Sequence, residues 1–190
     1  PGFAGCGRGY RTGRTNLMAE SPTPEPAAVD VYVSAGSNVA PEENLSLACR
    51  ELARRFGPLD LSGVYRNPPV GFSGDDFLNL VLRFSTAEGP AAVVAELERL
   101  HALAGRVRGQ ERFAPRTVDL DLLLYGAAVL PGAGIRVPRE DILKYGFVLG
   151  PLAQLAPELR HPVTGQTMAE LWAHFDQARY PMERVSDLLL

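Results

Sequence analysis

Two aspartates, Asp119 and Asp121, stand two residues apart in the otherwise apolar run 118–125. Alternate side chains of a strand project from one face, roughly 7 Å apart along the chain, so Leu120 and Leu122 would face the other way. Aspartate is uncommon in strands, and carboxylates this close repel each other unless a cation lies between them. Oxygen ligands on one rigid strand suit Mg²⁺, so the pair predicts a magnesium site. The alternative is two solvated aspartates on an edge strand.

A basic segment leads directly into this acidic pair. Residues 105–116 carry four arginines against one glutamate, a net charge of +3. Guanidinium groups match phosphate oxygens in bidentate geometry, and phosphate-binding cations beside Mg²⁺ are the groups that phosphoryl transfer requires. A solvated loop in an arginine-rich protein is the alternative interpretation. Lys144, the only lysine, follows no glycine-rich loop, so a nucleotide would be held by arginine and metal instead of a Walker sequence.

The elements that must position these residues predict an α+β fold. Apolar and β-branched runs between turn signals indicate strands over 31–35, 59–65, 77–84 and 118–125. Apolar residues at helical spacing indicate one helix from Pro41 to Gly57 and another from Pro90 to Gly105. The resulting order β-α-β-β-α-β is that of a ferredoxin-like core, an antiparallel sheet with helices packed on it.

The chain ends lie outside this core. Residues 1–28 are expected to form a flexible tail, part of which need not be native, and residues 29–190 a single domain. An extra C-terminal helix is expected at Thr167, where Glu170 completes a capping box.

Composition restricts the function further. Hydrophobic residues make up 46% of the 190 residues and charged residues 22%, as in ordinary globular proteins. The net charge of −3 argues against a nucleic-acid partner, and no apolar run is long enough for a membrane helix. Two cysteines, Cys6 and Cys49, make no disulfide framework, which indicates a reducing compartment and a cytoplasmic protein.

The segment 105–121, GRVRGQERFAPRTVDLD, closely resembles the signature of the 6-hydroxymethyl-7,8-dihydropterin pyrophosphokinases, a family of folate-pathway enzymes. Four shorter segments support the resemblance, which spans about residues 31–162: AGSN at 35–38, YRNPPVG at 65–71, FLN at 77–79 and YGFVL at 145–149. It implies Mg²⁺-dependent transfer of pyrophosphate from ATP to the hydroxymethyl group of a reduced pterin, releasing AMP. A monomer is expected rather than an oligomer.

By position, the resemblance assigns roles to individual residues. Asp119 and Asp121 would hold two Mg²⁺ ions, and Arg106 and Arg116 would be catalytic cations acting on the phosphates. ATP would be bound by Arg108, Arg112, Leu122, Arg136 and Arg139. The pterin would be bound by Gly36, Asn67, Pro68, Val70, Phe77, Asn79, Phe113 and Phe147. Of these, Asn79 would bond the amide-like edge of the ring, and Phe113 and Phe147 would stack on its two faces.

Some residues depart from the family pattern. His101 stands where an acid is common and is expected to be structural, while Phe77 and Phe113 replace a frequent tyrosine and tryptophan. Arg139 and Glu140 replace a pair that commonly includes histidine near ATP.

Two other functions compete with the pyrophosphokinase. A ferredoxin-like RNA-binding module would need the aromatic RNP pattern on its strands, which this sequence lacks, and the net charge of the folded body is negative. A catalytically silent pterin or nucleotide binder would not need both the acidic pair and the arginine segment.

Overall fold

The computed structural model describes residues 27–71, 73–105, 117–132 and 134–185. Within these ranges six strands form one sheet: β1 (Val29–Ser37), β2 (Asp60–Leu61), β3 (Val64–Asn67), β4 (Phe77–Thr86), β5 (Asp119–Tyr125) and β8 (Glu183–Val185). Their order is β5-β1-β4-β3-β8, with β2 also paired to β4, and these pairings are antiparallel. A separate hairpin joins β6 (Leu130–Pro131) to β7 (Arg136–Val137).

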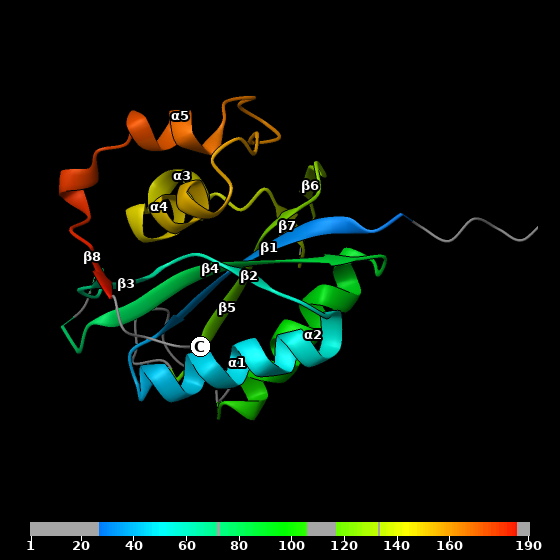
Figure 1. The fold of residues 1–190 in the computed structure, drawn as a ribbon, viewed down its shortest axis with the longest axis horizontal. Helices are drawn as coiled ribbons and strands as arrows, with labels where there is room; N and C mark the ends of the chain where they lie inside the picture. The colour runs from blue at the N-terminus through cyan, green and yellow to red at the C-terminus, as the bar shows by residue number, and fades with distance from the viewer. Residues whose placement is uncertain (1–26, 72, 106–116, 133, 186–190) are drawn as a thin grey trace, which may run out of the picture.

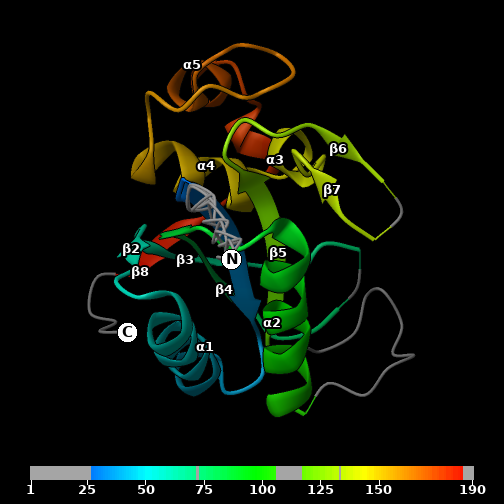
Figure 2. The ribbon, with the colours of Figure 1, turned by 90° about the vertical axis from the view of Figure 1, so that its right-hand side faces the viewer.

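Helices cover both faces of the sheet, as Figures 1 and 2 show. One face carries α1 (Pro41–Phe56) and α2 (Pro90–Leu103). The other carries α3 (Asp141–Lys144), α4 (Gly146–Leu155) and α5 (Met168–Ala173), which the short 3₁₀ helix η1 (Gln177–Arg179) follows. The prediction of an α+β fold with helices packed on an antiparallel sheet is confirmed. Among the described residues, no helix combines the length and apolar character needed to cross a membrane.

Each face of the sheet has its own hydrophobic core. The core beneath α1 and α2 takes alternate residues of the strands, such as Val31 of β1 and Leu120 of β5. The core on the opposite face is built around α4, with Leu149 and Leu152 fully buried against the sheet. Because every strand contributes to both faces by alternation, a polar residue placed between two buried ones emerges on the opposite face.

A β-bulge interrupts β5 after the acidic pair. Along β1, the partner of Val33 is Leu122 and the partner of Tyr32 is Leu124, so Leu123 is an extra residue on β5. Leu123 and Leu124 consequently both belong to the α4 core, whereas Leu122 lies beneath α2. The sequence pattern does not predict this bulge, because a run of leucines carries no alternation to break.

The strand expected over 59–65 is divided into β2 and β3 at Ser62. Ser62 donates its N–H to the Val81 carbonyl at 2.9 Å, and its hydroxyl oxygen accepts the Val81 N–H at 2.9 Å. The side chain thus replaces a backbone acceptor, and the pairing with β4 continues through the break.

The C-terminal region contains more structure than the predicted helix. The capping box at α5 is confirmed, since Thr167 N–H donates to Glu170 Oε2 at 2.8 Å and Thr167 Oγ1 accepts the Glu170 N–H at 3.1 Å. Helix α4 and strand β8 are not predicted. Glycine suggests a loop in α4, but Gly146 is needed for close packing, because a Cβ there would lie 2.9 Å from the Cβ of Tyr180.

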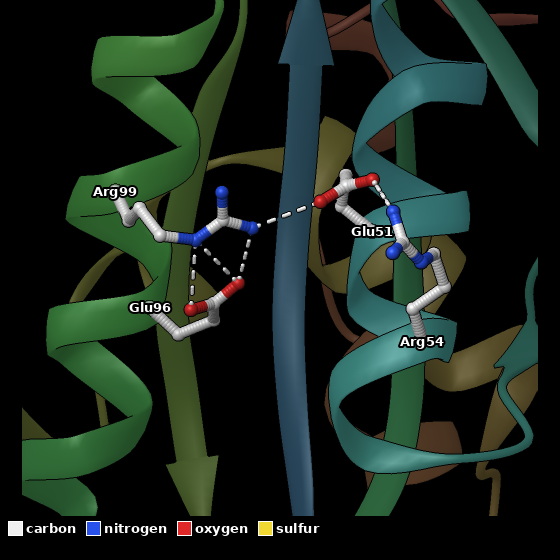
Figure 3. Close-up of polar contacts among 4 residues, drawn as sticks. All are labelled: Glu51, Arg54, Glu96 and Arg99. Atoms are coloured by element: carbon white, nitrogen blue, oxygen red, sulfur yellow. Dashed lines mark hydrogen bonds and ion pairs between the residues drawn. The ribbon is translucent and has the colours of Figure 1, made fainter.

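An ion-pair network joins α1 to α2 across their exposed sides (Figure 3). Arg99 of α2 donates to Glu96 on its own helix at 2.8 Å and to Glu51 of α1 at 3.0 Å. Glu51 also accepts from Arg54 at 2.9 Å. These hydrogen bonds lower the pKa of Glu51 below its ordinary value, first through Arg99 and then through Arg54.

Candidate active site

The acidic pair lies on the sheet face opposite α1 and α2. Asp119 and Asp121 are both partly exposed, whereas Leu120 and Leu122 are buried beneath the helices, as the alternation predicts. Among the described residues, no group of three or more His, Cys, Asp or Glu side chains gathers at a metal-binding distance. Two partly exposed carboxylates on one strand fit a cation such as Mg²⁺, which takes one or two protein carboxylates and completes its shell with water and substrate phosphates.

The register of the sheet places Asp119 in one row with two of the predicted pterin residues, Gly36 and Asn79. Asp119 of β5 is paired with Gly36 of β1, Gly36 with Asn79 of β4, and Asn79 with Tyr65 of β3. Directly paired residues share a face, so these four positions cross the sheet side by side. Gly36, the residue between the carboxylate and the amide, contributes no side chain to the row.

The side chain of Asn79 occupies the space that Gly36 leaves. A Cβ on Gly36 would stand 2.4 Å from Asn79 Oδ1 and 3.9 Å from a ring atom of Phe77. Phe77 and Asn79 therefore both border the same backbone position from β4. The close approach explains why the row requires a glycine here and brings the amide oxygen toward the Asp119 strand.

The orientation of the Asn79 amide is fixed by a hydrogen-bond chain. The Pro68 carbonyl can only accept, so the Asn67 side chain directs its nitrogen there, at 3.0 Å. The Asn67 oxygen then accepts from Asn79 Nδ2 at 2.7 Å. Asn79 consequently turns its oxygen toward Gly36 and can accept a hydrogen bond from a ligand N–H. The sequence places Asn67 at the pterin site but does not reveal that this buried side chain orients Asn79.

Arg139 brings a positive charge to the acidic pair. Its Nη2 lies 3.0 Å from Asp121 Oδ1, and its Nε lies 2.6 Å from Asp141 Oδ2. Burial alone would lower the pKa of the Arg139 guanidinium, but the carboxylates of Asp121, Asp141 and Asp119 raise it above the ordinary arginine value. Arg139 is thus permanently charged, and the structure joins a residue predicted to bind ATP to one predicted to bind metal.

An aromatic cluster surrounds the predicted stacking residue Phe147 at the start of α4. Its ring stacks on Tyr145, with centroids 5.1 Å apart, and meets Tyr180 edge-on at 6.2 Å. Tyr180 also meets Tyr145 edge-on at 6.0 Å. The segment after α5 therefore returns to support Phe147, a contribution that the sequence alone does not reveal because Tyr180 lies far from every motif.

The remaining predicted residues are placed as follows. Leu122 is 6% exposed and packs in the core beneath α2, so its side chain is not available to adenine from the Asp119 face, and only its backbone remains for that role. Arg136 is exposed and pairs with Glu140 at 2.9 Å, while Pro68 and Val70 are exposed beyond Asn67. The predictions for Arg106, Arg108, Arg112, Phe113 and Arg116 lie outside the described residues.

Comparison with known proteins connects this geometry to one family. A family model described as 7,8-dihydro-6-hydroxymethylpterin-pyrophosphokinase matches residues 32–157. Two proteins described as 2-amino-4-hydroxy-6-hydroxymethyldihydropteridine pyrophosphokinase are similar over most of their length. That of Haemophilus influenzae is 31% identical over 77% of this chain and 93% of its own. That of Pseudomonas aeruginosa is 37% identical over 75% of this chain and 90% of its own.

A solved structure shares the fold. The wild-type HPPK-DHPS of Plasmodium falciparum aligns with a TM-score of 0.63 and 12% identity. The alignment covers 78% of this chain and 42% of the solved one, so this chain spans less than half the length of that relative.

Proposed function

Because the chain belongs to the 7,8-dihydro-6-hydroxymethylpterin-pyrophosphokinase family, we propose that the Asp119 face of its sheet is where pyrophosphate passes from ATP to the pterin. In this folate-pathway reaction the hydroxymethyl oxygen forms a bond to the β-phosphorus of ATP. The bond from that phosphorus to the α,β-bridging oxygen breaks, the hydroxyl proton is lost, and AMP leaves. The chain is thus an ATP-dependent transferase, and its site residues are assigned below.

Asp119 and Asp121 would hold Mg²⁺ through their carboxylates. Both stand on one rigid strand, on one face, and neither is fully buried, which suits a cation that must also reach substrate oxygens. When bound, Mg²⁺ neutralises charge on the phosphates and positions them for in-line attack. The expectation of two ions rests on the family resemblance.

The pterin would lie over Gly36, beside the carboxylates. The Asn79 oxygen would accept the ring's amide N–H, and Asn67 would keep that oxygen in place through the 2.7 Å bond between the two side chains. Phe77 and Phe147 would supply apolar contact with the flat ring, together with Phe113, Pro68 and Val70. The absence of a side chain at Gly36 would allow the hydroxymethyl group to extend toward Asp119.

ATP would be bound by arginines around the acidic pair. Among the described arginines assigned to ATP, Arg139 is in contact with the acidic pair, at 3.0 Å from Asp121. Arg106 and Arg116 are assigned as catalytic cations from the family signature, and Arg108, Arg112 and Arg136 as further phosphate contacts. The Leu122 backbone would contact adenine.

We also propose a fold type, an oligomeric state and a cellular location for this chain. The order β5-β1-β4-β3 supports a ferredoxin-like core, with β8 as an addition at one edge. We expect a monomer located in the cytoplasm, which size-exclusion chromatography with light scattering and cell fractionation would test.

The observation that carries the site assignment is the row Asp119–Gly36–Asn79. It sets the Asp119 carboxylate beside the Asn79 side-chain oxygen, which can accept a hydrogen bond from the N–H of a pterin ring. AMP formation should require ATP, Mg²⁺ and the hydroxymethyl dihydropterin together. Asp121→Asn should abolish AMP formation and leave the fold intact, whereas the matched control Asp176→Asn should remain active. Normal turnover of Asp121→Asn would refute the metal assignment, and pterin binding without AMP formation by the wild type would indicate a silent binder.

A further inference from the structure

We propose that Arg139 is a resident counter-ion of Asp121, which the metal must displace and which ATP draws away, so that metal binds more tightly when nucleotide is present. This inference rests on the proposed metal role of Asp121. It concerns a residue that departs from the family pattern, and it is argued from how the fold holds that residue.

The β-bulge in β5 holds the backbone of Arg139. Leu123 is the extra residue on β5, without a register partner on β1, and its carbonyl accepts the Arg139 N–H at 2.9 Å. One residue, Leu122, separates Leu123 from Asp121 along the strand, so this bond places the arginine backbone close to the acidic pair. Bulges commonly redirect a strand neighbour toward a site in this way.

The side chain of Arg139 is divided between two carboxylates. Its Nε contacts Asp141 Oδ2 at 2.6 Å and its Nη2 contacts Asp121 Oδ1 at 3.0 Å. The side chains of Arg139, Asp121 and Asp141 are 38%, 31% and 25% exposed. The Arg139–Asp121 ion pair is therefore partly exposed and accessible to a ligand from solvent. Asp141 remains as an anchor if the contact with Asp121 is lost.

A cation on Asp121 and the guanidinium on the same carboxylate compete for its charge. Two positive groups that share one carboxylate repel each other, so the ion pair weakens metal binding to the nucleotide-free protein. When Arg139 releases Asp121 it loses an ion pair, and the phosphates of ATP can replace that ion pair. A guanidinium group binds phosphate oxygens at least as well as carboxylate oxygens. Metal and nucleotide binding are then coupled through one side chain, and the coupling must be reciprocal.

The test measures Mn²⁺ binding to the full chain by electron paramagnetic resonance, with and without α,β-methylene-ATP and without turnover. Arg139→Gln removes the charge and should tighten Mn²⁺ binding about fivefold in the absence of nucleotide, the range of a partly exposed ion pair. It should also weaken binding of the analogue. Arg139→Lys keeps the charge and should stay near wild type in nucleotide-free Mn²⁺ affinity. Arg55→Gln, which loses the ion pair to Glu88 and the contact of the guanidinium with the Phe56 ring, is the matched control.

The outcomes separate this inference from the assignment on which it rests. Unchanged or weaker nucleotide-free Mn²⁺ binding by Arg139→Gln, with a wild-type unfolding curve, would overturn the inference. Unchanged Mn²⁺ binding by Asp121→Asn in the presence of the analogue would overturn the metal assignment itself. If Asp121→Asn loses Mn²⁺ and Arg139→Gln does not gain it, only the counter-ion role fails.

Discussion

The imidazole Nε2 of His101 accepts a hydrogen bond from the backbone N–H of Leu120, 2.8 Å away. His101 is 4% exposed in α2, and Leu120 stands between the two aspartates of β5. The bond therefore satisfies an amide on the outer edge of β5, the end strand of the sheet that the described residues form. The structural role expected for His101 is confirmed, and it operates on the strand that carries the acidic pair.

Replacing His101 tests this contact. His101→Leu leaves the Leu120 N–H buried without an acceptor and should cost about 1–3 kcal/mol of unfolding free energy. His101→Gln, whose amide oxygen can accept, should recover part of that loss. Urea unfolding measures both, with the exposed His174→Gln as control, and hydrogen exchange should accelerate at Leu120 in the leucine variant. Equal stability of the leucine and glutamine variants would contradict the role of the bond.

The amide chain at the pterin site predicts a difference between two asparagines. Asn79→Asp replaces the donor toward Asn67 with a second acceptor and places a negative charge beside the pterin ring. Pterin affinity should fall about tenfold or more, which corresponds to the free energy of roughly one hydrogen bond. Asn67→Ala should weaken pterin binding less, because it frees the Asn79 amide without removing it. Calorimetric titration with the pterin compares them, and a larger loss for Asn67→Ala would reverse the assigned roles.

Gly36→Ala should damage the site more than the fold. The added Cβ would lie 2.4 Å from Asn79 Oδ1, so the Asn79 side chain must move and its acceptor is misplaced. We expect pterin affinity to fall about tenfold, the loss of one well-placed hydrogen bond. Gly132→Ala meets only the Ile135 carbonyl at 3.7 Å and should change neither binding nor stability. Wild-type pterin affinity in Gly36→Ala would show that the Asn79 oxygen is not used.

Burial raises the pKa of the Cys49 thiol to about 11. Because the thiolate is the reactive form, Cys49 should react with iodoacetamide at pH 8 roughly a hundredfold more slowly than an ordinary cysteine, and the rate should climb as pH rises toward 11. The measurement uses a Cys6→Ser background, with the denatured chain as the fast control. Rapid labelling of the folded protein at pH 8 would show that the thiol is accessible.

The ion-pair network between α1 and α2 predicts a small stability term that depends on pH. The pKa of Glu51 is lowered in the folded protein, so its contribution is present above the ordinary glutamate pKa and is lost as pH falls through the folded value. Glu51→Gln should lower the melting temperature at pH 7 by no more than about 2 °C. The difference from wild type should begin to shrink as pH falls past the ordinary glutamate pKa and vanish below the lowered folded-state pKa, and it should also shrink in high salt. A difference that persists in acid would indicate packing instead of charge.

The sequence predicts the part of the fold that local signals encode. Pro41 and Pro90 begin helices and Gly105 has the positive φ of 80° expected after a helix end, so α1 and α2 are found close to their expected bounds. Helix α4 is missed because its glycines signal a loop, whereas they are required by rings that approach from residues 172–182. Such long-range packing leaves no local pattern.

The site likewise contains features that local sequence signals predict and features that depend on long-range contacts. The spacing of Asp119 and Asp121 predicts their common face, because alternation is a local property. The contact of Arg139 with Asp121 depends on a bulge within a run of leucines, and the Asn67–Asn79 bond depends on strand register. Neither can be predicted from spacing, since both arise from the pairing of distant segments.

Strand β8 covers one edge of the sheet. Its residues 183–185 pair with β3, which would otherwise be the outermost strand of the sheet. The family match stops at residue 157, so a protein shortened there would keep every assigned site residue yet expose the peptide groups of Val64–Asn67. An unpaired edge of this kind invites strand addition from a second molecule. Strand β8 thus covers a strand edge that would otherwise be open to addition of a strand from a second molecule.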